Sequence, residues 1–191
     1  SIEYDASLRQ SVYWSSVPKV VYTYNGNTVI KEGQDAVDIY NLNSQGYATS
    51  KIYRSYSGGI TIFDTYTYDA DGHMLTHFST DSLNYSRDTI IQTWSGGNMT
   101  SSYHGAANDL SAYYFSELTT YTYLTDKIST IENENFGKLF LGKGSKNLIN
   151  TISIVNAGVT TLNYEYDTKG RVKKQTGIPA NSLYSAEYTY Y

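Results

Sequence analysis

The sequence of 191 residues contains no cysteine, only two prolines and no long apolar run. Without cysteine, the chain can form no disulfide, thiolate metal site or thiol nucleophile. No apolar stretch approaches the roughly 20 residues that a membrane helix needs. Basic residues are also few, since 14 Lys and Arg stand against 18 Asp and Glu, and they form no block. A net charge of −4 opposes binding to phosphate, so we expect no nucleic-acid partner.

Tyrosine is the abundant residue, with 22 copies against 5 Phe and 2 Trp. Each buried aromatic side chain removes roughly 150–250 Å² of surface from water, so tyrosines can form a core in place of Leu and Phe. The length fits one large domain, and no linker interrupts it, so we predict a single domain over residues 1–191. The chain begins at Ser1. We therefore expect a trimmed mature fragment whose targeting segment lies outside it.

A short unit recurs along the chain and indicates hairpins. Residues 66–74 read YTYDADGHM, residues 164–172 read YEYDTKGRV, and residues 40–48 read YNLNSQGYA. Asp or Asn is suited to open a type I turn, and Gly to take the left-handed position of the bulge that follows it. We therefore predict positive φ at Gly72 and Gly170.

This turn geometry fixes a strand register and two faces. It pairs Tyr68 with Met74, Tyr66 with Thr76, and Tyr166 with Val172. One face is then predicted to carry Tyr66, Tyr68, Met74 and Phe78, and the opposite face to carry Thr65, Thr67, Asp69, His73 and His77. Because the Tyr-x-Tyr pairs share one face of each strand, we predict that they point inward: Tyr22, Tyr24, Tyr66, Tyr68, Tyr121, Tyr123, Tyr164 and Tyr166.

Other turns are marked by glycine. Asn25-Gly26 is a type I′ signal, Gly58-Gly59 is a candidate turn, and Gly96-Gly97 would place Trp94 opposite Met99. The pattern breaks at residues 133–148, which read as a long ordered loop. The fold class that follows is all-β: an antiparallel up-and-down meander of about 12–16 strands.

Pairing of residues 187–191 with residues 2–4 would remove the exposed edges of such a meander. We therefore expect a barrel that is closed or nearly closed. With Tyr inside, its outer face carries mainly Thr, Ser, Asn, Asp and Glu, which favours a soluble barrel over a lipid-facing one.

The Tyr-x-Tyr-Asp-x-x-Gly units resemble the tyrosine–aspartate repeats of large bacterial surface proteins. Residues 140–148, FLGKGSKNL, together with the hairpin after them, resemble a family of uncharacterised lipoproteins from gut Gram-negative anaerobes. That family is described as a domain of unknown function with a porin-like fold. The resemblance implies a protein of the periplasm or cell surface, held by a lipid anchor outside this chain, and it offers no activity.

Several motifs resemble catalytic or binding signatures without completing them. Residues 142–146, GKGSK, lack the spacing and the strand-to-helix context of a phosphate loop. Asp69 and Asp71 resemble the start of a calcium loop that lacks its later ligands. We interpret the three histidines, His73, His77 and His104, as solvent-facing residues, and we predict no metal site, no cofactor and no catalytic residue.

The leading hypothesis is a non-enzymatic binding or scaffolding domain with an unknown protein or glycan partner. The alternative is a glycan-handling protein, either a carbohydrate binder or a weak glycoside hydrolase. A solvent-exposed cluster of three or more Tyr or Trp beside a carboxylate pair would favour that alternative. The residues that we predict to bind a ligand are Phe140, Lys143, Lys146 and Asn147.

Overall fold

The computed structural model describes residues 2–4, 6, 10–14, 19–59, 61–83, 85–110, 113–178 and 184–188. Its strands form one antiparallel sheet in which each strand pairs with the next along the chain. The predicted all-β meander is confirmed, and its 15 strands fall within the expected range. The strands are β1 (Ile2–Tyr4), β2 (Gln10–Trp14), β3 (Lys19–Asn25), β4 (Thr28–Glu32), β5 (Ala36–Leu42), β6 (Ala48–Ser55), β7 (Thr61–Tyr68), β8 (Met74–Asp81), β9 (Ser86–Ser95), β10 (Asn98–Asn108), β11 (Tyr113–Ile128), β12 (Asn147–Ile154), β13 (Gly158–Tyr166), β14 (Val172–Ile178) and β15 (Tyr184–Glu187).

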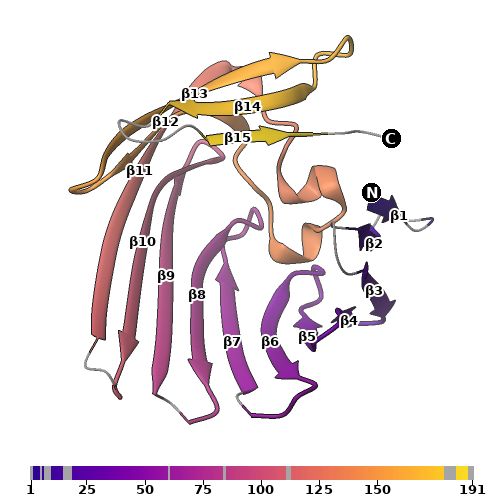
Figure 1. Cartoon of the computed structure of the whole chain (residues 1–191). Coiled ribbons are helices and arrows are strands. Elements are labelled where there is room, and N and C mark those ends of the chain that lie inside the picture. The colour runs from indigo at the N-terminus through magenta and orange to yellow at the C-terminus, as the bar shows by residue number, and fades with distance from the viewer. Residues whose placement is uncertain are drawn as a thin grey trace.

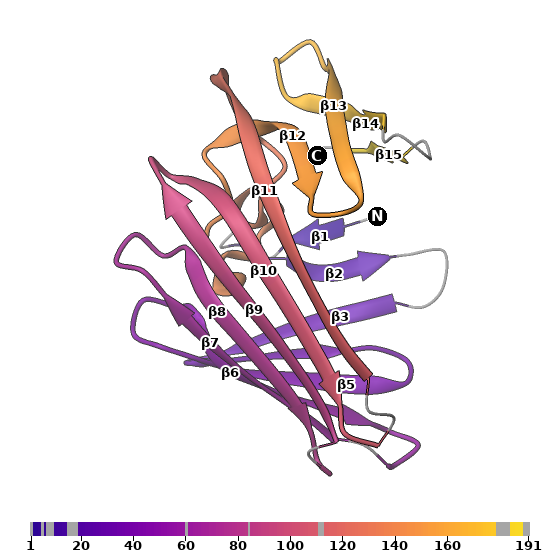
Figure 2. The same ribbon diagram turned by 90° about the vertical axis from the view of Figure 1, so that its left-hand side faces the viewer.

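The sheet curls around a central space and brings its two ends near each other (Figures 1 and 2). Within the described residues β15 pairs only with β14 and β1 only with β2, so the curl stays open at this point. The predicted pairing of the two chain ends is therefore not seen, and residues 189–191 lie outside the described part. No helix in the described part of the chain has the length and apolar character of a membrane span.

The repeated unit forms the same turn three times, starting at Asn43, Asp69 and Asp167. In each turn, the backbone N–H of the glycine three residues later donates to the carbonyl of the Asp or Asn. The side-chain Oδ1 of that Asp or Asn accepts two further backbone N–H groups at 2.9–3.0 Å. Gly72 and Gly170 have φ of 92° and 76°, so the predicted left-handed glycines are confirmed.

A β-bulge follows each of these turns and changes which residues share a face. Tyr68 pairs with Met74 as predicted, but the next pair is Thr67 with Thr76, so Leu75 is left over. Tyr66 consequently lies opposite His77, and the predicted pair of Tyr66 with Thr76 is wrong. Because of the extra residue, two side chains lie on the face opposite to the one predicted. His77 lies on the inner face with Tyr66, and Phe78 lies on the outer face with Thr65.

The same geometry recurs at the C-terminal hairpin, where Tyr166 pairs with Val172 as predicted. The Gly96-Gly97 turn also forms as predicted, with Trp94 opposite Met99. The turn predicted at Asn25-Gly26 is displaced by one residue, because Asn25 pairs with Thr28. Gly26, with φ of 55°, is then the first central residue, which is the type II′ arrangement.

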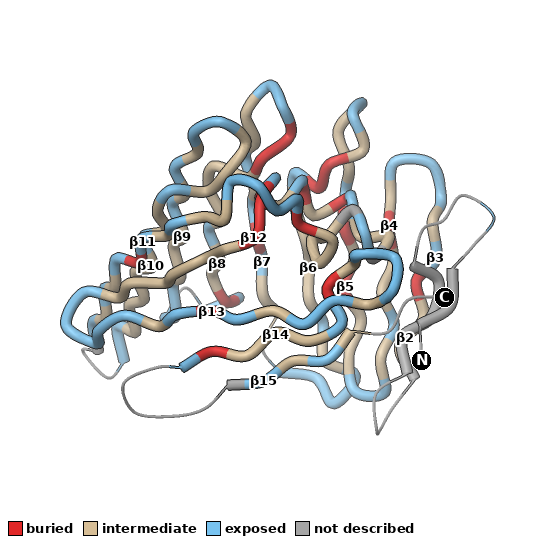
Figure 3. The backbone as a smooth tube through the Cα atoms, turned by 90° about the horizontal axis from the view of Figure 1, so that it is seen from above, coloured by how far each residue is buried: buried red, intermediate tan, exposed pale blue. Residues whose placement is uncertain are grey.

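The long loop lies inside the curl and is called here the plug, residues 129–146 (Figure 1). It contains two short 3₁₀ turns, η1 (Asn133–Phe136) and η2 (Leu139–Leu141), and β12 begins directly after it. Phe140 is the centre of the main core, with ring centroids 5.0 Å from Tyr40 and 6.4 Å from Tyr22. Seen from above, buried residues are concentrated where the plug meets β3 to β7 (Figure 3).

The predicted inward direction of the Tyr-x-Tyr pairs holds except at the last of them. Tyr22 is buried, and its companions are half-buried apart from Tyr166, which is 41% exposed. Tyr166 lies at the end of β13, where the plug covers Val172 through a bond from the Val172 N–H to Thr130 Oγ1. Thr130 lies at the start of the plug, and the ring of Tyr166 remains exposed beside this contact.

Candidate functional site

A cavity of about 510 Å³ lies at the rim of the curl, where the plug crosses the β7–β8 and β9–β10 turns. We call it the rim cavity, and its lining includes Asp71, His73, Gly97, Ser129, Lys143 and Lys146. Behind it, a cavity of about 180 Å³ reaches toward the inner face of the sheet. This second cavity is lined by Met74, Trp94, Met99, Glu132 and Lys143, among others.

The plug backbone at the rim cavity is fixed by hydrogen bonds to both turns. The Lys143 N–H donates to the Gly72 carbonyl at 2.9 Å, and the Lys146 N–H donates to the Gly97 carbonyl at 2.8 Å. Both lysine side chains are exposed. Two cationic side chains therefore extend from a held backbone beside a cavity, and these two residues were among those predicted to bind a ligand.

The other two predicted ligand-binding residues, Phe140 and Asn147, lie in the core. Phe140 is 5% exposed within its cage of tyrosines. The Asn147 side-chain amide donates to the carbonyls of Thr125 and Lys127, and its backbone N–H donates to Asn98. Their side chains fix the plug to the sheet and expose only 5–6% of their surface, so a ligand can reach little of either, and their ligand-binding role stays a prediction.

The two glycines around Lys143 are required by packing. Gly142 has φ of 90°, and a Cβ atom there would meet the ring of Tyr68. A Cβ atom on Gly144 would overlap the carboxylate of Glu132. The Gly-x-Gly spacing thus lets the plug pass close to Tyr68 and Glu132.

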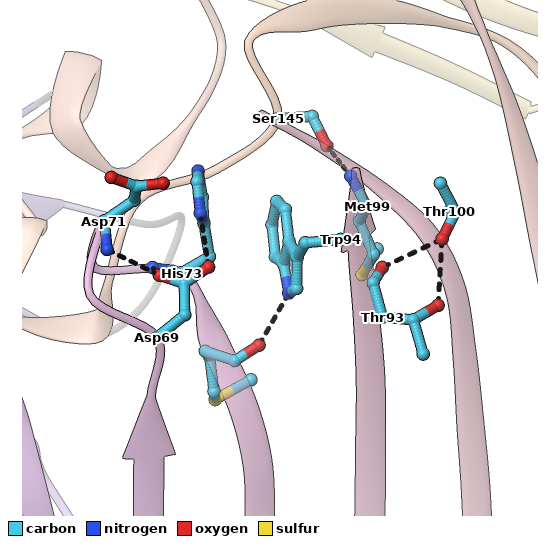
Figure 4. Close-up of polar contacts among 9 residues, drawn as sticks. Asp69, Asp71, His73, Thr93, Trp94, Met99, Thr100 and Ser145 are labelled. Atoms are coloured by element: carbon cyan, nitrogen blue, oxygen red, sulfur yellow. Dashed lines mark hydrogen bonds and ion pairs between the residues drawn. The ribbon is translucent and has the colours of Figure 1, made fainter. Parts of the chain in front are cut away.

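His73 lines the rim cavity and lies beside Trp94, which lines the smaller cavity (Figure 4). Its ring stacks on Trp94 with centroids 4.4 Å apart, and its Nδ1 lies 2.9 Å from Asp69 Oδ2. The Trp94 Nε1–H donates to the Met74 carbonyl at 2.7 Å. His73 is only 8% exposed, so its predicted solvent-facing position is wrong. Partial burial acts to raise the pKa of Asp69, but hydrogen bonds from the His73 ring and backbone outweigh it and lower that pKa.

Asp69, Asp71 and His73 offer oxygen and nitrogen atoms within 4.8 Å of one another. The equivalent turn at Asp167 has Lys169 and Arg171 where this one has Asp71 and His73, and its Asp accepts the same two backbone N–H bonds. The Asp69 carboxylate thus stabilises its turn through the same hydrogen bonds as Asp167 does in the equivalent turn. Turn chemistry explains the cluster without a metal ion.

The inner face of the sheet also carries charges that the sequence reasoning missed. Lys51 contacts Asp64, whose side chain is 1% exposed, and Tyr66 donates to the same carboxylate at 3.2 Å. His77 Nε2 lies 3.4 Å from Asp64, and its ring stacks on Tyr66. Burial acts to raise the pKa of Asp64, but hydrogen bonds from His77 and Lys51 hold it well below its usual range. The signal was available, because Asp64 is two residues from the inward Tyr66 and therefore shares its face.

The outer face carries a single row of apolar side chains across eight strands, β4 to β11, called here the outer belt. Most neighbours in it are direct cross-strand partners and the rest are diagonal ones. Its C-terminal five residues are 40–46% exposed. The belt consists of Ile30, Ile39, Ile52, Phe63, Phe78, Ile91, Tyr103 and Leu118.

Part of the outer belt borders a hollow of about 550 Å³, called here the outer hollow. It is lined by Phe78, Arg87, Thr89, Tyr103, Gly105, Tyr114, Phe115 and neighbouring small residues. Sequence reasoning missed it because the bulge at Leu75 places Phe78 on the outer face. No regular two-residue alternation could have indicated that change.

Comparison with known proteins defines the class of the fold. No family model matches the chain, and no curated protein matches it. A porin-like protein from Bacteroides uniformis has a similar solved structure, with a TM-score of 0.66 and 15% identity over 97% of this chain and 84% of the other. A porin-like protein from Bacteroides vulgatus gives a TM-score of 0.69 and 15% identity over 96% of this chain and 88% of the other. The chain therefore has the fold of these porin-like proteins.

Proposed function

We propose that this chain is a non-enzymatic binding or scaffolding domain of a bacterial cell envelope. In this proposal, a lipid anchor on a segment outside the sequence holds it in the periplasm or at the cell surface. The likeness to porin-like proteins of Bacteroides supports the envelope location. The plug supports a binding role over a transport role, because it packs its own aromatic core into the curl of the sheet.

The rim cavity is the observation that carries the proposal. Its backbone is held by hydrogen bonds on both sides, while Lys143 and Lys146 remain exposed beside it. A largely pre-formed cavity with a small number of polar or charged groups is the usual construction of a binding site. A partner that offers carboxylate or hydroxyl groups, on a protein or a glycan, fits this surface.

A thermal-shift screen of glycans and acidic peptides tests this role. The wild-type chain and a Lys143→Ala/Lys146→Ala variant are compared, with Lys169→Ala as a matched control at an exposed turn outside the cavity. We expect at least one ligand to raise the melting temperature of the wild type and the control but not of the double variant. Equal shifts in all three proteins would reject the rim cavity as the site.

Glycan binding is a second candidate function, and a separate observation favours it. Phe78, Tyr103 and Tyr114 are exposed aromatic residues that line one hollow on the outer face. Arg87 lies in the same hollow and pairs with the carboxylate of Asp109 at 2.8 Å. Two tyrosines and a phenylalanine beside a single carboxylate meet the aromatic part of the arrangement expected of a glycan binder, and not the carboxylate pair expected of a hydrolase.

A further inference from the structure

We infer that the outer hollow is a binding site for a neutral glycan chain that lies across strands β8 to β11. The inference rests on the second candidate function and gives it a site, a ligand class and an orientation. The site lies on the opposite face of the sheet from the plug. It is therefore separate from the rim cavity.

The floor of the hollow is a row of side chains that runs across the strands. Phe78 lies opposite Thr89, Thr89 opposite Gly105, and Gly105 opposite Ser116. Neighbouring strands are about 4.8 Å apart, so Phe78 and Gly105 are separated by about 10 Å. The row thus alternates an apolar or glycine position with a hydroxyl.

Gly105 brings a second ring into this row. Tyr103 lies two residues before it on the same face, and a Cβ atom at Gly105 would lie only 3.0 Å from the Tyr103 hydroxyl. The Tyr103 ring therefore lies along the strand and over the glycine. A glycine inside a strand commonly marks such a close approach. As a result, the Phe78 and Tyr103 rings lie about two strand spacings apart with the Thr89 hydroxyl between them.

Tyr114 completes the aromatic surface at the end of the row. It is 75% exposed and lies opposite Ala107, a small residue that leaves its ring uncovered. A hollow of about 550 Å³ is within the range of 300–1,000 Å³ that is typical of ligand sites. Flat apolar rings with hydroxyls between them match a pyranose chain, which has C–H faces and hydroxyl edges.

The charges of the hollow favour a neutral ligand. Arg87 lies at its border, and its guanidinium is compensated by Asp109. The fork of Arg87 has five N–H donors, so it can still donate to sugar hydroxyls while paired with a carboxylate. The side chains that line the hollow beside Arg87 include no Asp, Glu, Lys or His.

Two other occupants fit this surface less well. A lipid-facing band is about 25 Å tall, whereas the outer belt is one residue tall, because Thr76 and Thr80 flank Phe78 on the same strand. A second copy of the chain would have to bury about 800 Å² per partner for a stable interface. A single row on the convex side of a curled sheet offers only a narrow strip of contact.

Affinity gel electrophoresis with soluble polysaccharides tests the inference. The panel contains xyloglucan, glucomannan, arabinoxylan and a β-1,3-glucan, and the variants are Phe78→Ala, Tyr103→Ala and Gly105→Ala. Tyr56→Ala is the matched control, since Tyr56 is 57% exposed in the β6–β7 turn, away from the hollow. Circular dichroism establishes that each variant is folded.

We expect at least one polysaccharide to retard the wild type and Tyr56→Ala equally. Loss of either ring should weaken binding by about tenfold, the effect of one lost aromatic contact. Gly105→Ala should weaken binding too, because its methyl group displaces the Tyr103 ring.

Each other result overturns the inference in a recognisable way. If Phe78→Ala and Tyr103→Ala bind like the wild type while Lys143→Ala/Lys146→Ala does not, glycan binding stands and the outer hollow is rejected. If no polysaccharide retards the wild type, both glycan binding and this site are rejected. Vesicle co-sedimentation or dimer formation that depends on Tyr103, without polysaccharide binding, assigns the surface to a membrane or to a second copy.

Discussion

The two faces of the curled sheet are formed by the same strands but by different kinds of residue. The inner face has tyrosines and paired charges that pack against the plug, with Tyr22, Tyr40 and Phe140 at the centre. The outer face has threonine and serine, with hydroxyl pairs such as Thr67 with Thr76 and Thr122 with Thr151. One row of apolar residues crosses it.

The difference shows how a sheet can obtain a core without a second sheet. The plug gives the inner tyrosines an apolar partner, and their hydroxyls reach backbone carbonyls, as Tyr123 does at Met99 and Tyr164 at Ile149. The outer face lacks a partner within the described part of the chain. Its apolar row is therefore accessible to other molecules, whereas most tyrosines of the inner face pack against the plug or the sheet.

Alkaline pH should produce the largest measurable difference between the two faces of the sheet. Burial raises the pKa of several inner tyrosines, to about 12 for Tyr123 and higher for Tyr40 and Tyr66. A raised folded pKa means that this stability is complete below the unfolded value of about 10 and is lost as pH rises beyond it. We expect unfolding between about pH 10 and pH 12, with ionisation of the buried tyrosines and loss of the β-sheet dichroism in one transition. Complete tyrosine ionisation in a still-folded sheet would contradict the buried position of these rings.

Truncation of the plug anchor should have the next largest effect. Phe140→Ala removes the ring that Tyr22 and Tyr40 surround, and we expect a loss of about 3–5 kcal/mol in the free energy of unfolding. Phe63→Ala is the matched control in the outer belt, where the ring is 43% exposed, and should lose less than about 1 kcal/mol. Urea denaturation measures both values. Similar losses would mean that the two faces do not differ in burial as described.

The same motif position can be compared at two hairpins. Tyr68 stacks on Tyr47 with ring centroids 5.1 Å apart and lies under Gly142, whereas Tyr166 is 41% exposed. Tyr68→Ala should therefore lower the free energy of unfolding by about 2–3 kcal/mol, and Tyr166→Ala by about 0.5 kcal/mol or less. Thermal or urea unfolding of the two variants decides this. A larger loss at Tyr166 would show that the C-terminal hairpin is also covered.

The equivalent glycines give the smallest contrast. Both have positive φ, so Gly170→Ala should cost about 1 kcal/mol from backbone strain alone. A Cβ atom at Gly72 would also meet the ring of Tyr47, while Gly170 faces open space. Gly72→Ala should therefore lower the melting temperature more than Gly170→Ala does. Equal decreases in melting temperature would show that the Tyr47 ring adds no packing cost at Gly72 and that backbone strain in the turn is the whole effect.

The local sequence was sufficient to predict the strands and the three repeated turns, because Asp or Asn and Gly act through bonds within a few residues of themselves. The inward direction of Tyr66 and Tyr68 also followed, since alternate residues of a strand share a face. The roles of Phe140 and Asn147 did not follow, because their partners lie on strands far away in the sequence. Sequence alone indicated a break at the plug but not where the plug would go.

The chain by itself thus determined an antiparallel meander with tyrosines on one face. Only the tertiary structure decided which tyrosines are covered, because cover depends on which strands the plug packs against. It also decided that Phe78 joins Tyr103 on the outer face, through one extra residue in the register at Leu75. The candidate sites lie where segments far apart in sequence meet or where a bulge breaks the alternation, and a regular two-residue alternation indicates neither.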